Sequence, residues 1–213
     1  MESYVALLRA VNLAGAHQIR MAELKELFLE RGFADVESLL QSGNIAFRAE
    51  ATPEEELERG LEQAVAQRFG LVTEIFVRHA ADLRRVVQGN PFPAEAKLDP
   101  AHLTVAFLKE APGPEEWLAL RSAIRGPERV EGSGRHGYIV YPDGIGRSHL
   151  TPAIIERTLG TPATSRNWNT VTRLDQLAGR AEPVSDTRPN VRPAAERPAP
   201  RRARHRKSEG KPA

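Results

Sequence analysis

The sequence predicts an α+β fold, a tandem duplication of ferredoxin-like βαββαβ units followed by a C-terminal helix and a disordered basic tail. The first observation is an internal repeat in which residues 31–47 match residues 125–141 without a gap. Six of the seventeen positions are identical, and Phe47 is replaced by Tyr141. The second observation is the same order of strand-like and helix-like segments around both copies. The third is a change of composition near residue 180.

The first copy begins with a strand at residues 4–11, which is apolar on both alternating sides and is therefore expected to be covered on both faces. Apolar residues at helical spacing follow over residues 21–28, and Gly32 ends this helix. Two short strands at residues 36–40 and 44–48 then form a hairpin.

Residues 52 and 53 of the first copy are Thr-Pro, which is typical of a capping residue followed by proline in the first helical position. Apolar residues from Leu57 to Phe69 form one face of the predicted helix, which ends at Gly70. A strand at residues 73–77 completes the βαββαβ order.

The second copy repeats this order between residues 102 and 179. The elements expected there are a strand at 103–108, a helix at 115–124, a hairpin of 129–131 and 138–141, a helix at 152–159, a strand at 163–165 and a terminal helix anchored by Trp168. The domains expected are therefore subdomain 1 at 1–79, a linker with a short helix and a Pro-rich segment at 80–101, subdomain 2 at 102–179 and the tail at 180–213.

The charge of the chain is divided between body and tail. Residues 180–213 hold ten of the 30 Lys and Arg residues and four of the 28 acidic residues, so the tail is about +6 and the remainder about −4. An acidic body argues against a basic nucleic-acid surface, although the tail could contact nucleic acid weakly and non-specifically. The chain has no cysteine and no long apolar run, so we expect a cytoplasmic protein without a membrane span.

The first copy differs from the second in the connection that follows the first strand. Residues 12–20 are polar and contain glycine, whereas only residues 110–114 make the same connection in the second copy. Because strands one and three are neighbours in this topology, the end of the first strand should meet the turn before the third. The side chains expected to converge there are Arg9, Asn12, Gln41, Ser42 and Asn44.

A guanidinium, carboxamides and a hydroxyl in one place suit the recognition of an anion or an amide. Arg166 and Asn167, just before the terminal helix, are further candidates for such a site. The structural alternatives are that Ser42-Gly43-Asn44 only forms a tight turn, that Arg9 neutralises a carboxylate, and that Asn167 or Asn169 caps the helix.

The patterns of several common catalytic sites do not occur in this sequence. The six histidines lack metal-ligand spacing, and no phosphate-binding loop or nucleophile motif is present, so we assign no metal, cofactor or catalytic residue. Whether the protein is an enzyme stays open. Beside a small-molecule or anion-binding protein, the alternatives are a protein–protein interaction module and a nucleic-acid-associated protein. Base stacking on the sheet would require exposed aromatic residues on its strands.

Four segments in order form a recognisable pattern, LRAVNLAG at 8–15, MAEL at 21–24, QSGN at 41–44 and RNWNTV at 166–171. Together they resemble the bacterial DUF1697 family of unknown function. The resemblance covers about residues 2–178 and implies a pair of ferredoxin-like subdomains, without an established reaction. Family members often carry RGINVGGK in the first loop, whereas Ala10, Ala14 and Ala16 occupy the matching places here. The resemblance therefore leaves two expectations, that His17 takes the place of the family's lysine or that the site is weaker here.

Overall fold

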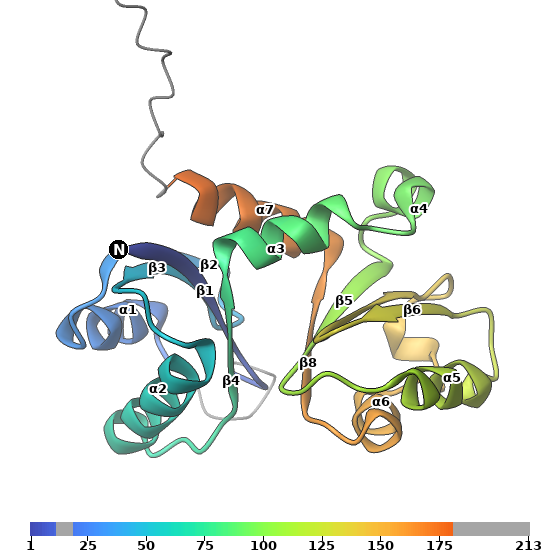
Figure 1. Ribbon diagram of the computed structural model, residues 1–213, viewed down its shortest axis with the longest axis horizontal. Helices are drawn as coiled ribbons and strands as arrows, with labels where there is room; N and C mark the ends of the chain where they lie inside the picture. The colour runs from blue at the N-terminus through green and yellow to red at the C-terminus, as the bar shows by residue number, and fades with distance from the viewer. Residues whose placement is uncertain (12–18, 181–213) are drawn as a thin grey trace, which may run out of the picture. The chain divides into compact units, whose positions relative to one another are not determined.

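The computed structural model describes residues 1–11 and 19–180, and in this part of the chain it forms two four-stranded antiparallel sheets with helices (Figure 1). The first sheet has the order β2-β3-β1-β4, and the second has the matching order β6-β7-β5-β8. We call the segments from β1 to β4 and from β5 to β8 the first and second halves. The tandem ferredoxin-like α+β fold predicted from the sequence is confirmed.

The first half consists of β1 (Glu2–Leu8), α1 (Met21–Glu30), β2 (Ala34–Leu39), β3 (Asn44–Ala49), α2 (Glu54–Phe69) and β4 (Ile75–His79). The helices α3 (Ala80–Gln88) and α4 (Pro93–Leu98) connect the halves. The second half consists of β5 (Leu103–Leu108), α5 (Pro114–Ala123), β6 (Arg129–Ser133), β7 (His136–Val140), the 3-10 turn η1 (Ile145–Arg147), α6 (Pro152–Leu159) and β8 (Ala163–Asn167), and α7 (Trp168–Arg180) follows it.

Several boundaries differ from the sequence prediction, and three of the differences have a clear local cause. The first strand ends at Leu8 rather than residue 11, because Ala10 adopts φ +52° and turns the chain out of the sheet. The second helix has Pro53 as its N-cap, since the Thr52 hydroxyl donates to the Glu50 carbonyl (2.9 Å) instead of capping. The Pro-rich part of the linker contains α4, because Pro93 stands in the first helical turn, where proline is tolerated.

Both faces of both sheets are covered by other elements. Helices α1 and α2 cover one face of the first sheet, α5 and α6 cover one face of the second, and α3 and α7 lie side by side along the remaining faces (Figure 1). One apolar cluster joins the halves there. Most of its members come from β1, β4, α3, β5, β7 and α7, and they include Leu7, Phe76, Phe107, Tyr138 and Leu174.

The pairing of the strands gives the exact correspondence between the halves. Leu8 pairs with Ile75 and Leu108 with Ala163 at matching ends of the two sheets, so Leu108 corresponds to Leu8 and Ala163 to Ile75. By the same registers Arg166 corresponds to Arg78.

The gapless repeat found in the sequence is wrong by two residues in the third strand of each half. Leu7 pairs with Asn44 and Phe107 with His136, so the equivalent of Asn44 is His136 and not residue 138. The cause is the hairpin turn, which spans residues 40–43 in the first half and only 134–135 in the second. The first half therefore has two extra residues in this turn, next to the predicted site.

The predicted basic tail lies outside the described residues, except that α7 continues through Arg180, the first residue assigned to it. Within the described part of the chain, none of the helices combines the length and apolar character that a membrane span requires.

Candidate functional site

A cavity of about 570 Å³ lies at the end of β1, where the first half meets β8 and α6 of the second. We call it the site cavity. Its apolar wall contains Leu8, Val11, Leu40, Ile145, Ile155 and Ala163. Its polar groups come from Arg9, Ser42, Thr164, Ser165, Arg166 and Asn167. The volume is in the range of pockets that hold small molecules.

The turn between β2 and β3 forms one side of the site cavity. The Asn44 side chain is fully buried, and its Nδ2 donates to the Leu39 carbonyl (3.1 Å) and to Ser42 Oγ (2.8 Å). Gly43 has φ +69°, and a Cβ there would lie 2.8 Å from Leu8 Cβ. Asn44 therefore holds the turn by hydrogen bonds, and Gly43 packs closely against the end of β1. These contacts agree with the alternative in which Ser42-Gly43-Asn44 forms a tight turn.

Arg166 reaches from β8 into the first half and uses every N–H of its guanidinium. Its Nε donates to Asn44 Oδ1 (2.5 Å), and its Nη2 donates to the carbonyls of Leu8 (2.8 Å) and Ser42 (3.2 Å). Its Nη1 donates to Thr164 Oγ1 (2.8 Å) and to the Ser165 carbonyl (2.9 Å). Because a guanidinium has five N–H donors, these five contacts satisfy all of them.

The charge of Arg166 is not matched by a carboxylate among the described residues, although its hydrogen bonds are complete. Its partners are carbonyl, amide and hydroxyl oxygens, and no acidic side chain of residues 1–11 or 19–180 forms an ion pair with it. Burial lowers the pKa of the Arg166 guanidinium to about 10, so it remains a cation at neutral pH. The site cavity thus adjoins an enclosed positive charge that no carboxylate of the described residues compensates.

Arg9 also lines the site cavity, but two acids offset its charge. Its Nη1 donates to Glu74 of its own half, and its Nη2 donates to Glu156 of α6 (2.8 Å). Hydrogen bonding to Glu74 is the main reason why the pKa of Arg9 is raised. The geometry agrees with the alternative in which Arg9 neutralises carboxylates.

Arg9 and Arg166 also hold the two halves together. The residues at the equivalent positions of the other half make matching contacts across the same boundary. Lys109, the equivalent of Arg9, donates to Glu62 (2.7 Å) and Glu58 (2.8 Å) of α2. Arg78, the equivalent of Arg166, donates to the carbonyls of Leu108 and Arg135 (3.5 Å for the latter). Each half therefore places two cations on the other half.

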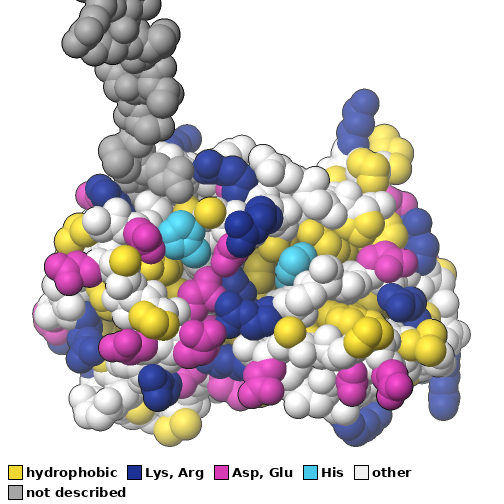
Figure 2. Space-filling view, viewed as in Figure 1, with side chains coloured by type: hydrophobic (Ala, Val, Ile, Leu, Met, Phe, Trp, Pro, Cys, Tyr) yellow, Lys and Arg dark blue, Asp and Glu magenta, His cyan; other side chains and the backbone are white. Residues whose placement is uncertain are grey.

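The Arg78 side differs from the Arg166 side in its counter-charges. Arg78 has Glu58 at 3.4 Å and Glu54 at 3.9 Å. Burial and the neighbouring Arg135 lower its pKa, while these two acids oppose that shift. In Figure 2, Lys and Arg side chains lie beside Asp and Glu side chains in the region where Figure 1 places β4. Arg166 has no such acids beside it in the described part of the chain.

The remaining predicted site residues are distributed as follows. Gln41 is exposed in the turn, and Ser42 and Asn44 hold Arg166. Asn167 lies at the edge of the site cavity, where its Oδ1 accepts from the Thr170 amide (3.0 Å) and hydroxyl (2.9 Å), as expected of a helix cap. Asn12 and His17 lie outside the described residues.

Sequence reasoning named Arg166 and Asn167 as candidates but missed the other residues of the second half at this place. Thr164, Ser165, Pro152 and Ile155 line the site cavity, and the convergence was predicted only for the ends of strands one and three. A signal was present, since both final strands carry an arginine at the same position, Arg78 and Arg166. It could be recognised only with the correct alignment of the halves.

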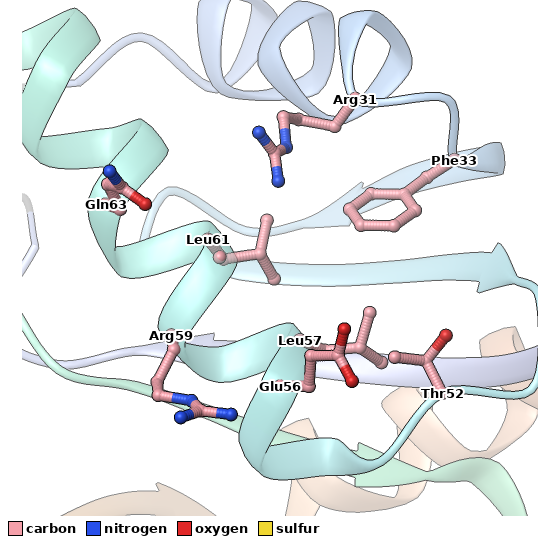
Figure 3. A pocket seen from close by; sticks show the side chains of 9 residues that line it. Arg31, Phe33, Thr52, Glu56, Leu57, Arg59, Leu61 and Gln63 are labelled. Carbon is pink, nitrogen blue, oxygen red and sulfur yellow. The ribbon is translucent and has the colours of Figure 1, made fainter.

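A second hollow, of about 510 Å³, lies between α2 and the segment after α1. Figure 3 shows Arg31 and Phe33 facing Leu57 and Leu61 of α2 across it. The charged residues on its rim, Arg31 among them, are exposed, and its buried members are apolar. It therefore lacks the enclosed polar groups of the site cavity.

Base stacking on a sheet would require exposed aromatic residues, but those on the strands or directly after them are buried. Tyr4, Phe47, Tyr138 and Tyr141 each expose 3% or less of their surface. Neither sheet can therefore offer these rings to a nucleic acid.

Comparison with known proteins supports the fold and the family. A search of curated proteins gives no match. Among solved structures, the conserved bacterial protein SP0830 from Streptococcus pneumoniae is similar with a TM-score of 0.64 and 21% identity, over 83% of this chain and 98% of that one. The pattern of the family described as "Protein of unknown function (DUF1697)" matches residues 1–138. The chain belongs to the DUF1697 family.

Proposed function

We propose that this protein binds a small anionic ligand in the site cavity. The observation that carries the proposal is the Arg166 guanidinium, which is enclosed, charged at neutral pH and without a carboxylate partner among the described residues. Taking a cation out of water costs several kcal/mol, and a counter-charge placed beside it recovers part of that cost. A bound anion would supply this counter-charge.

The surroundings favour a small molecule over a macromolecular partner. The cation lies at a cavity with an apolar wall formed by residues such as Leu40 and Ile155, rather than on a flat basic surface. Apolar walls with a few polar groups are the usual composition of small-ligand sites. Arg166 acts by its charge, because its five N–H donors already have partners.

Thermal denaturation and NMR together test this proposal. Acetate, hexanoate and inorganic phosphate are each compared with chloride at equal ionic strength, and a bound anion raises the melting temperature by mass action. The Nε–H signal of Arg166 in wild-type protein should move during the titration, while that of Arg121, which pairs with Glu131 on the surface (3.5 Å), should not.

The Arg166 signal requires no variant, so loss of folding cannot obscure the result. If no anion shifts this signal or those of the cavity amides, the proposed function is wrong.

A further inference from the structure

The first half shows which group fills the place equivalent to the site cavity. There Glu58, on α2, is buried, with 4% of its surface exposed. It accepts hydrogen bonds from the Val77 amide (2.8 Å), Lys109 Nζ (2.8 Å) and Arg78 Nη1 (3.4 Å). One carboxylate thus satisfies an edge-strand amide and two cations.

The second half retains equivalents of these donors but lacks the acid. Glu62 accepts from the Ile75 amide (2.9 Å), and Glu156 accepts from the equivalent Ala163 amide (2.9 Å). One helical turn before Glu62 is Glu58, whereas one turn before Glu156 is Pro152. Helix α6 begins at Pro152, and Pro152 lines the site cavity.

The strand amide that corresponds to Val77 is that of Ser165. The Lys109 amide donates to the Pro162 carbonyl, and residues alternate in an antiparallel ladder, so the Ser165 amide points away from β5. In the described part of the chain, nothing accepts a hydrogen bond from it. Both Ser165 and its neighbour Thr164 line the site cavity.

The Thr164 hydroxyl takes part of the role of the absent carboxylate. Arg78 gives one Nη1 hydrogen bond to the Val77 carbonyl (2.6 Å) and the other to Glu58, and Arg166 gives one to the Ser165 carbonyl and the other to Thr164 Oγ1. Thr164 Oγ1 accepts from Arg166, which leaves its own O–H free to donate to a ligand.

We infer, on the basis of the proposed anion site, that the ligand is a carboxylate with an apolar body. It binds at the place in the second half that is equivalent to the place of the Glu58 carboxylate in the first half. Its carboxylate accepts from the Ser165 amide and the Thr164 hydroxyl, opposite the Arg166 charge. Its body lies against the apolar wall, which includes Leu40, Ile145 and Ile155.

A compact polyanion fits this place less well than a monocarboxylate does. Among the described residues Arg166 has no carboxylate partner, and the Ser165 amide and the Thr164 hydroxyl supply the two donors that one carboxylate group needs. The apolar wall gives no partner to further phosphate oxygens, and burying such oxygens without hydrogen bonds is costly.

Titration of the wild-type protein with three probes tests the ligand class. The probes are 4-methylpentanoate, the uncharged 4-methylpentanamide and inorganic phosphate, and the readout is the Ser165 amide signal in NMR. We expect 4-methylpentanoate to shift this signal and to bind at least about tenfold more tightly than the other two probes. If phosphate binds at Arg166 as tightly as 4-methylpentanoate, this inference fails while the proposed anion site stands.

Two variants of residue 165 test the amide itself. Ser165→Pro removes an N–H that lies on the open edge of β8, where proline is tolerated, and should weaken 4-methylpentanoate binding about tenfold or more. Ser165→Ala loses the same hydroxyl but retains the amide, so it should bind the probe about tenfold or more tightly than Ser165→Pro does. Equal binding by both variants would overturn the inference.

Variants of α6 test whether a protein carboxylate can replace the ligand. Pro152→Glu should raise the melting temperature above that of Pro152→Gln and abolish 4-methylpentanoate binding. The pair Ala153→Glu and Ala153→Gln measures what any acid at this helix start contributes, because Ala153 is exposed in the same turn. If the Glu–Gln difference is no larger at 152 than at 153, no vacant carboxylate place exists.

Discussion

Ala10, which lines the site cavity, has a left-handed backbone conformation that favours glycine. Its φ is +52°, and Leu40, which lines the same cavity, has φ +62°. A left-handed conformation costs an L-residue about 1–2 kcal/mol. Two strained residues at one cavity mark it as a place where the backbone is shaped for more than stability.

Replacing Ala10 with glycine should therefore stabilise the protein. Relief of the left-handed strain outweighs the greater freedom of glycine in the unfolded chain, so Ala10→Gly should raise the free energy of unfolding by up to about 1 kcal/mol. Ala119→Gly, on the exposed side of α5, should lower it by about 0.5–1 kcal/mol. Urea denaturation measures both, and a loss of stability in Ala10→Gly would contradict the strain argument.

The three tyrosines make the stability depend on alkaline pH. Burial raises the pKa of Tyr138 to about 12, and burial is also the main cause of the raised pKa values of Tyr4 and Tyr141. A raised folded-state pKa means that the folded protein holds these protons more tightly. The protonated tyrosines contribute to the free energy of unfolding in full below pH 10, and this contribution is lost as the pH rises through 12. For Tyr138 it is on the order of 2–3 kcal/mol.

Phenolate absorbance should accordingly appear well above pH 10 and together with the loss of circular dichroism. These are all the tyrosines of the chain, so no ordinary tyrosine obscures the signal. Phenolate formation near pH 10 with the circular dichroism intact would show that the rings are accessible in the folded state.

At the scale of elements, α2 protects the open edge of β4. Glu54, Glu58 and Glu62 recur every fourth residue on one side of the helix and accept from the amides of His79 (2.6 Å), Val77 and Ile75. The helix advances about 6 Å per four residues and the strand about 6.8 Å per two, so the two repeats nearly coincide. Edge amides that are already bonded cannot recruit another strand.

Glu58→Ala should be strongly destabilising because it leaves the Val77 amide, Arg78 and Lys109 short of a buried partner. We expect a loss of about 3–5 kcal/mol in the free energy of unfolding. Glu56→Ala, at an exposed position of the same helix, should change it by less than about 0.5 kcal/mol. Chemical denaturation of both variants gives the comparison, and similar losses would show that the burial of Glu58 carries no weight.

The sequence predicted elements better than it predicted their partners. Apolar periodicity located every strand and the main helices, because burial imposes period 2 or 3.6 on neighbouring residues. The sequence indicated Arg166 as a candidate site residue but did not predict its contacts. Its hydrogen bonds to Leu8 and Asn44 join residues more than 120 positions apart. Local patterns also could not show that the second hairpin turn is two residues shorter, which moved the equivalent of Asn44 from residue 138 to His136.

At the scale of the whole molecule, neither half has a complete core of its own. The cluster that contains Leu7, Phe76, Phe107 and Tyr138 draws its members from both sheets and from α3 and α7. Separation of the halves would expose the apolar face of each sheet.

The fragment of residues 1–100 should therefore not exist as a folded monomer. It lacks α7 and the second sheet, which cover Val5, Leu7 and Phe76 in the full chain. Size-exclusion chromatography with circular dichroism would show an oligomer or an unfolded chain. A monomer with native-like cooperativity would show that the shared cluster is dispensable.

The shared cluster has an evolutionary consequence. A single βαββαβ unit with such a face would have to pair with its own copy, and in a symmetric dimer the places beside Arg78 and Arg166 would be identical. Once two copies are fused into one chain, the residues beside Arg78 and those beside Arg166 can be substituted independently. The first half could then keep its glutamate as a permanent structural contact. The second half, with a proline at the equivalent position, became able to bind a ligand from outside the chain.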